Sequence, residues 1–465
     1  MKAADDERKY SIWRYFNSYE NLHETWNWRL LMTALIRRAR SLDRQNLEAL
    51  FTSSAFMVTA GLTFLNAIML ANALGTDGRG AVAAAFGNTI VLGWAFQIGV
   101  PGAAAYFAKD VGNRHTIMSA WAMTLFGAIP LALLLIPFYL WVIAGDAFAE
   151  GGTSLRNWYF AFIALNLFNG PFLSAVFWLR GVGNTIKFNA LLALPQLLIT
   201  FGYFVLFVSG TMTVNRALAS TFIMMSLGWV IGLVTTDSLP GRDFDTAVFK
   251  KVRSYSLRSW IGNLSFFVSL RVDQMVLAGL VSLEELGVYA IAAALSTLSS
   301  PIARGVAQAV LPFVRNAASD DERLFRVKRA ISMVALSSIV SLVAIGALAT
   351  WFVPFIFSDA FSASVRPLLL LLPGAFATDV TQVYTTALSS FDRPQDASKA
   401  QIAAAIATVI GLVVLLPRYG IDGAAITTSI SYWVALLVSI FYWRRLRGEV
   451  LRGERTGHTE SISAS

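Results

Sequence analysis

The sequence of 465 residues is 56% hydrophobic and only 14% charged, whereas a soluble chain carries roughly 25% charged residues. This composition excludes an ordinary soluble domain and predicts an all-α polytopic membrane protein. The formal net charge of +9 does not indicate a nucleic-acid binder, because the basic residues lie mostly between apolar segments and not on one soluble face.

Residue types that often carry catalysis or metal binding are scarce. There is no cysteine, which excludes disulfides, thiolate catalysis and cysteine-ligated metals. The three histidines, His23, His115 and His458, fall in predicted tails or loops. We therefore expect neither an enzyme nor a metal site, and no cofactor.

The first segment, residues 1–48, is polar and basic and contains no cleavable signal peptide. Within it, residues 25–40 mix tryptophan and leucine with four arginines. This pattern is typical of an amphipathic helix on an anionic membrane surface. A basic tail that only fixes the orientation of the protein explains it equally well.

From residue 49 onward, apolar segments follow one another at the length of a membrane span, about 20 residues. We predict about twelve transmembrane helices, at residues 49–73, 81–108, 117–143, 158–180, 188–209, 216–236, 259–282, 287–314, 329–352, 365–390, 400–416 and 424–443.

The distribution of Lys and Arg predicts the orientation. With the N-terminus inside, the cytoplasmic segments hold about 30 of the 37 basic residues, as the positive-inside rule requires. A miscount by one span would destroy this alternation. We therefore predict a multi-pass membrane protein with both termini in the cytoplasm.

The chain also contains an internal repeat. Residues 74–83, between the first two spans, correspond to residues 281–290, about 207 positions later. An even number of spans per repeat predicts two parallel lobes, 49–236 and 259–444, around a central cavity. The cytoplasmic linker 237–258 is the predicted hinge, and the polar tail 445–465 is predicted to be disordered.

The seventh and eighth predicted spans carry charges deep in the bilayer: Arg271 and Asp273 in one, Arg304 in the other. Such a charge costs at least about 2.5–3.5 kcal/mol, so it normally faces a partner or a watery cavity. Asn263 and Gln274 share a helical face with Arg271. The residues predict a polar, cationic chamber that binds an anion.

Two further observations bear on this chamber. Asp379 in the tenth span is expected at a depth similar to that of Arg304, and a purely structural ion pair between them is the alternative interpretation. Asp273 and Asp379 are accordingly candidates for ion pairing or for coupling to a transported ion. The first lobe offers only the amides Asn66, Asn88 and Gln97 as candidate binding residues.

Three segments resemble a known family. Residues 66–110 resemble the first two spans of bacterial polysaccharide flippases, the Wzx-like branch of the multidrug/oligosaccharidyl-lipid/polysaccharide (MOP) exporter superfamily. Residues 270–279, followed by 285–289, resemble the seventh span and turn of that family, and residues 416–425 the segment before its last span. The basic extension 1–48 and the scarcity of charge in the first six spans depart from the family pattern.

The resemblance implies a MATE/MOP-like fold of twelve to fourteen helices. It also implies a location in the bacterial cytoplasmic (inner) membrane. The implied substrate is an undecaprenyl-diphosphate-linked oligosaccharide, which is moved from the cytoplasmic to the outer leaflet for exopolysaccharide or O-antigen (lipopolysaccharide) synthesis. Arg271, Arg304, Asn263, Gln274 and Asn66 are then the expected substrate-binding residues.

Several alternatives and partners stay open at this point. The alternative functions are a cation-coupled multidrug exporter and a peptidoglycan-precursor (lipid II) flippase. The expected partners are the lipid-linked oligosaccharide and membrane lipids, with polymerase or export machinery as further candidates. We expect a monomer, and coupling to Na⁺ or H⁺ is undetermined.

Overall fold

The computed structural model describes residues 44–241, 243–315, 319–391 and 393–452. Within these ranges, the side chains of residues 44–53, 259, 261–271, 302, 308–313 and 315 lie outside the description. The regular elements of the described ranges are all helices, which confirms the predicted fold class. The predicted interfacial helix at 25–40 lies outside the described residues.

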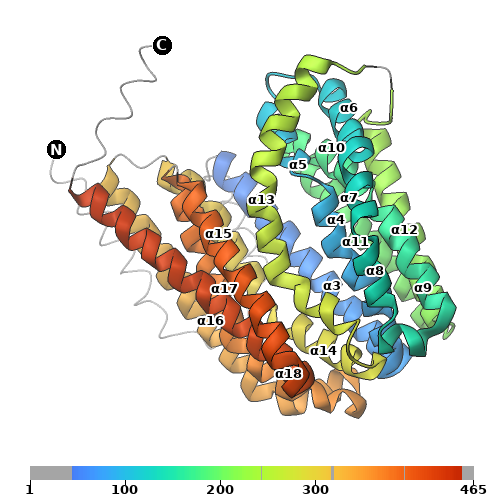
Figure 1. Cartoon of the computed structure of the whole chain (residues 1–465). Helices are drawn as coiled ribbons and strands as arrows, with labels where there is room; N and C mark the ends of the chain where they lie inside the picture. Colours follow the sequence, from blue (N-terminus) through green and yellow to red (C-terminus); the bar gives the residue numbers. More distant parts are fainter. Residues whose placement is uncertain (1–43, 242, 316–318, 392, 453–465) are drawn as a thin grey trace, which may run out of the picture. The chain divides into compact units, whose positions relative to one another are not determined.

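The chain divides into two compact units, Met1–Glu48 and Ala49–Ser465. Figure 1 labels the helices, most of which belong to the second unit, and their bounds in chain order are as follows: α3 (Arg44–Val82), η1 (Ala83–Gly87), α4 (Asn88–Phe96), α5 (Val100–Phe107), α6 (Asn113–Met123), η2 (Thr124–Ala128), α7 (Ile129–Leu134), α8 (Ile136–Ile143), α9 (Asp146–Asn166), α10 (Asn169–Gly181), α11 (Thr185–Val208), α12 (Val214–Thr235), α13 (Thr246–Leu277), α14 (Leu283–Ser296), α15 (Ser300–Arg315), α16 (Asp320–Phe357), η3 (Asp359–Ser364), α17 (Val365–Ser390) and α18 (Pro394–Leu451).

Seven of these helical segments are long and apolar enough to cross a membrane, or eight if the bent pair α9 and α10 forms one span. Their exposed faces are apolar: Leu336, Val340 and Val343 of α16, for example, are exposed side chains that would face lipid. The protein is therefore a multi-pass membrane protein. The count of twelve spans stays a prediction, because length and apolarity alone identify fewer.

Two long helices each contain a glycine at which the chain turns. Gly75 in α3 has φ 68° and Gly420 in α18 has φ 54°. Such left-handed backbone angles are accessible to glycine at little cost. Gly420 lies between the predicted segments 400–416 and 424–443, so α18 contains both of them. The helix then continues to Leu451, further than the predicted start of a disordered tail at 445.

Corresponding spans of the two halves are interrupted in the same way. α4 and α5 are separated at residues 97–99, and Pro101 stands in the first turn of α5. α14 and α15 are separated at residues 297–299, and Pro301 follows. Proline is tolerated in the first turn of a helix because the backbone N–H it lacks has no partner within the helix there. The shared interruption agrees with the predicted parallel repeat.

Each half has its own packing core of helices. In the N-terminal half, α10 packs against α5 and α6, and α11 packs against α12. In the C-terminal half, α17 contacts α14, α15, α16 and α18. Since α17 is the helix shared by these contacts, any side chain that it carries on its inner face is surrounded by protein.

α13 is attached to both halves. Its first part packs on α4, α5 and α6, and its last part packs on α18. In the first part, the ring of Tyr255 stacks on Tyr106 with centroids 4.6 Å apart, and Trp260 Nε1 donates to the Ala95 carbonyl at 3.0 Å. In the last part, Asp273 accepts a hydrogen bond from Thr428 of α18. This one helix therefore connects the two halves.

The linker before α13 is shorter and more firmly held than the sequence predicts. α13 begins at Thr246, so residues 246–258 are helical and not part of a loop. The remaining linker is fastened to α6, because Arg114 forms ion pairs with Asp237 at 2.7 Å and with Asp243 at 3.0 Å. The cluster of charged residues at 250–258 was interpreted as a loop, although a helix also exposes charge on its solvent-facing side.

Asp245 caps the N-terminus of α13. Its carboxylate accepts from the backbone N–H groups of Ala247 and Val248 at 2.7 and 3.1 Å. The hydrogen bond from Val248, followed by that from Ala247, lowers the pKa of Asp245. The cap therefore contributes stability at neutral pH that is lost as the pH falls through this lowered pKa.

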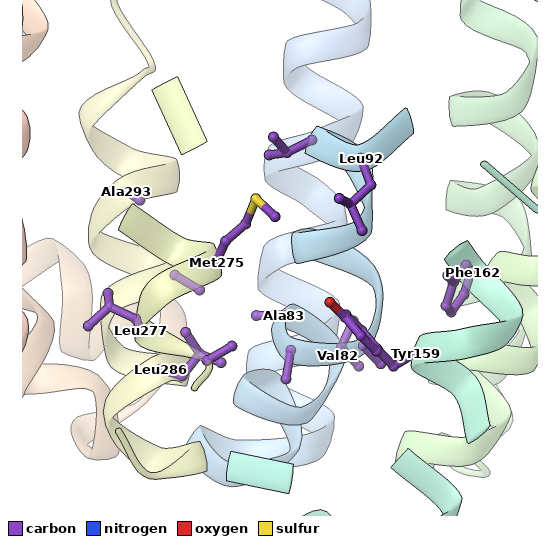
Figure 2. Packing of buried hydrophobic residues seen from close by; sticks show 14 of the residues in the cluster. Val82, Ala83, Leu92, Tyr159, Phe162, Met275, Leu277, Leu286 and Ala293 are labelled. Carbon is purple, nitrogen blue, oxygen red and sulfur yellow. The ribbon is translucent and has the colours of Figure 1, made fainter. Parts of the chain in front are cut away.

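A single hydrophobic cluster contains residues from both halves. Figure 2 shows Val82, Leu92 and Tyr159 of the N-terminal half together with Met275 and Leu286 of the C-terminal half. These five side chains are almost fully buried. The halves therefore share apolar contact area, and parting them would expose it.

The halves meet where the chain turns between spans. Glu150 Oε2 accepts a hydrogen bond from the Leu283 backbone N–H at 2.9 Å, and Asn72 Nδ2 donates to the Ile356 carbonyl at 2.7 Å. We call this region the Gly80 end, defined by residues 74–80, 144–152 and 279–287. The predicted orientation makes the Gly80 end the outer one.

Candidate functional site

A pocket lies among α13, α14, α15, α17 and α18, all of the C-terminal half. Most of the residues that line it are polar, and those that matter below are Asp273, Gln274, Ser300, Arg304, Gln382 and Thr428. Its volume of about 70 Å³ would hold several waters, each of which needs roughly 10–15 Å³, or one small ion. It is too small for a sugar diphosphate.

Asp273 joins three helices at the pocket. Its Oδ2 accepts hydrogen bonds from Tyr289 Oη of α14 at 2.5 Å and from Thr428 Oγ1 of α18 at 3.1 Å. The side chain of Asp273 is nearly buried. A buried carboxylate is tolerated when such donors replace water.

Asp379 occupies a second, fully buried position on α17. Its Oδ2 accepts from Ser299 Oγ, at the break between α14 and α15, and from Ser338 Oγ of α16, both at 2.7 Å. Arg304 of α15 also attracts it electrostatically. The interruption of the helix at 297–299 is therefore the feature that brings a serine hydroxyl to this carboxylate.

Arg304 is exposed, whereas Asp273 on the same pocket is buried. Among the described lining residues, these two carry the charges. A guanidinium at the edge of the pocket can contact a phosphate without the head group entering the small cavity, because its fork of N–H donors matches two phosphate oxygens.

The structure brings together some of the predicted site residues. Gln274 and Arg304 line the same pocket. Asn66 is buried on α3 in the other half and does not line it. The side chains of Asn263 and Arg271 lie outside the described residues, so their predicted roles stay predictions.

Sequence reasoning missed several partners in this region. Tyr289 and Thr428 hold Asp273, and Ser338 holds Asp379. Thr428 and Tyr432 line the pocket four residues apart on α18, a spacing that places both on one helical face. This pair of polar side chains in the last span was the pattern in the sequence from which the contribution of α18 to the pocket could have been predicted.

The fold is similar to that of several solved transporters. Over 86% of this chain and 96% of the other, it is similar to the inward-facing structure of a multidrug resistance MATE family transporter of the MOP superfamily, with a TM-score of 0.69 and 16% identity. It is also similar to the lipid II flippase MurJ, inward closed, with a TM-score of 0.68, 14% identity and coverage of 85% and 87%. A MOP superfamily transporter from Pyrococcus furiosus gives a TM-score of 0.61, 15% identity and coverage of 87% and 96%.

Part of the sequence also matches a family model. Residues 186–366 match the family model described as "Polysaccharide biosynthesis protein". No curated protein matches the chain significantly. The chain thus has the fold of MOP superfamily transporters, and the match over residues 186–366 agrees with the resemblance that the sequence indicated.

The pocket can be tested by thiol labelling. Because the natural sequence contains no cysteine, an introduced cysteine is the only thiol in the protein. We expect Ser300→Cys and Gln274→Cys to react with a small, membrane-impermeant thiol reagent, because both positions line a polar cavity. Ser439→Cys, at a fully buried position on α18, is the matched control and should not react. Failure of both pocket cysteines to react in any condition would show that water does not reach this site.

Proposed function

We propose that the protein is a flippase that moves an undecaprenyl-diphosphate-linked oligosaccharide across the bacterial cytoplasmic membrane, for exopolysaccharide or O-antigen synthesis. The match of residues 186–366 to the polysaccharide biosynthesis family carries this proposal. That segment includes α13, α14 and α15, and hence Arg271 and Arg304. The MOP transporter fold supports transport over catalysis.

In the proposed mechanism, the diphosphate meets Arg304 and Arg271 from the cytoplasmic side while the polyprenyl chain stays in lipid. Gln274 and Asn263 would donate to phosphate or sugar oxygens, and Asn66 would contribute from the other half. The halves then close behind the head group and part at the Gly80 end. Both termini stay in the cytoplasm, as the distribution of Lys and Arg predicts.

The proposal includes a coupling step. Asp273 and Asp379 are the proposed carboxylates for exchange of H⁺ or Na⁺, since both are buried and held by hydroxyl donors. A pocket with room for waters or a small ion beside Asp273 supports this role. No other cofactor is proposed. Polymerase or export proteins are proposed partners of a monomeric transporter.

Two alternatives differ in their cargo. A multidrug exporter for cations is disfavoured, because the buried polar side chains described in α3 to α12 are amides and hydroxyls and include no carboxylate. A lipid II flippase shares the diphosphate and the fold, so the distinction lies in the sugar and peptide that follow the phosphate.

A reconstituted assay tests the proposal. Purified protein in liposomes would be given undecaprenyl diphosphate carrying an oligosaccharide, and the fraction reached by an added glycosidase would be followed over time. We expect faster exposure than in protein-free liposomes. Parallel liposomes would contain lipid II or a fluorescent organic cation. Transport of the cation without movement of either lipid would contradict the proposal, and movement of lipid II alone would reassign the cargo.

A further inference from the structure

Gly80 and Gly287 are in backbone-to-backbone contact across the two halves. A Cβ atom built on Gly80 would lie 1.8 Å from the Leu283 carbonyl oxygen and 3.1 Å from the Gly287 nitrogen. A Cβ built on Gly287 would lie 2.0 Å from the Thr76 carbonyl oxygen and 3.0 Å from the Gly80 nitrogen. Because the atoms that it would meet belong to the backbone, no side-chain rotation can make room.

The contact has the symmetry of the internal repeat. Gly80 and Gly287 are about 207 positions apart, and so are Thr76 and Leu283, the residues whose carbonyls they approach. Each half therefore presents the same glycine to the same carbonyl of the other half. The two helices meet on the axis that relates the halves, at the place where a rocking motion would part them.

Other contacts at the Gly80 end also bring the backbones of the two halves close together. A Cβ on Gly145 would lie 2.2 Å from the Gly279 carbonyl oxygen. Glu150 accepts from the Leu283 backbone N–H at 2.9 Å, one residue after Ser282 caps the same helix. The exposed carboxylate of Glu150 thus fastens the N-terminus of α14, where the helix dipole favours a negative charge.

We propose that Gly80 and Gly287 form the closing contact of the gate at the Gly80 end, and that Glu150 latches it. Closing requires a hydrogen atom in place of a side chain at both positions, whereas opening does not. A methyl group at either glycine would therefore hold this end open and stop the transport cycle. The inference rests on the proposed function only for the statement that cargo leaves through this gate.

The test uses cysteine reporters next to the glycines. Ala83 and Ala290 follow Gly80 and Gly287 by three residues, are themselves repeat-related, and are only 7% and 5% exposed. In the intact gate, Ala83→Cys should react slowly with a maleimide. We expect Gly80→Ala to accelerate this reaction at least about fivefold, and Gly287→Ala to do the same for Ala290→Cys.

Gly61→Ala is the matched control, because a Cβ there meets nothing within 4 Å on the same helix, α3. It should leave the labelling rate unchanged. Glu150→Ala provides a variant that removes the latch without adding bulk at an exposed position, and should accelerate labelling about twofold or more. This arm decides the question even if the glycine variants do not fold.

Labelling is measured without any transport substrate, so the result does not depend on the cargo. Unchanged reporter rates in folded Gly80→Ala and Glu150→Ala proteins would overturn the gate. Faster labelling together with no translocation of lipid-linked oligosaccharide by the unaltered protein would leave the gate in place and refute the proposed cargo.

Discussion

Replacement of Arg304 by alanine is expected to slow translocation of the lipid-linked oligosaccharide by about 10- to 100-fold. A hydrogen bond to a charged group contributes about 1.5–3 kcal/mol, and each 1.4 kcal/mol corresponds to a factor of ten. Arg304 is exposed at the pocket edge, so its removal should affect binding of the phosphate more than folding. The measurement is the rate of glycosidase exposure in liposomes.

Two variants calibrate this effect. Arg304→Lys keeps the charge but loses the two-pronged geometry, so we expect an intermediate rate. Arg366→Ala removes a guanidinium that forms an ion pair with Asp422 at 2.9 Å but does not line the pocket, and it should change the rate less than twofold. An unchanged rate in Arg304→Ala, with normal protein abundance, would remove Arg304 from the substrate site.

Replacement of Asp379 by alanine is expected to destabilise the protein strongly. The fully buried carboxylate accepts from Ser299 and Ser338 and attracts Arg304. Without this acceptor the buried hydroxyls of Ser299 and Ser338 lose their hydrogen-bond partner, which costs about 1–3 kcal/mol for each. The midpoint of thermal unfolding in detergent, measured at one scan rate, should fall by about 2–6 °C.

A double variant separates the structural from the transport role. If Asp379 mainly balances Arg304, then Asp379→Ala combined with Arg304→Met should recover part of the lost stability, because the guanidinium that has lost its counter-charge is removed as well. Transport should stay impaired, since the phosphate has lost its guanidinium. Additive losses of stability in the double variant would show that the two side chains do not stabilise each other.

Composition and periodicity predicted the fold class, because a bilayer imposes a length and an apolarity on each span. The correspondence of residues 74–83 with residues 281–290 predicted the repeat. The interruption near Pro301 was likewise readable, since proline excludes the interior of a helix. The start of α13 could not be predicted from the sequence in the same way. Its polar first turns resemble a loop in composition, although Asp245 carries the signature of an N-cap.

Residues of the candidate site could be predicted from the sequence only where the pattern within a single helix was enough to identify them. Gln274 and Arg304 were selected because each is polar within an apolar segment, and they do line one pocket. The hydroxyl partners Tyr289 and Ser338 come from other helices. Their roles depend on which helix faces which, and local patterns do not contain that information.

The attachment of α13 to both halves has a mechanical consequence. Tyr255 and Trp260 travel with the first half, whereas Asp273 travels with the second. Any rotation between the halves must therefore curve this helix between Trp260 and Asp273, or detach it at one side. The energy of bending the intervening three turns would then favour rotation of the halves back to the arrangement in which α13 is least bent. The unstrained shape of this one helix would therefore set how long the inward-facing and outward-facing arrangements each persist.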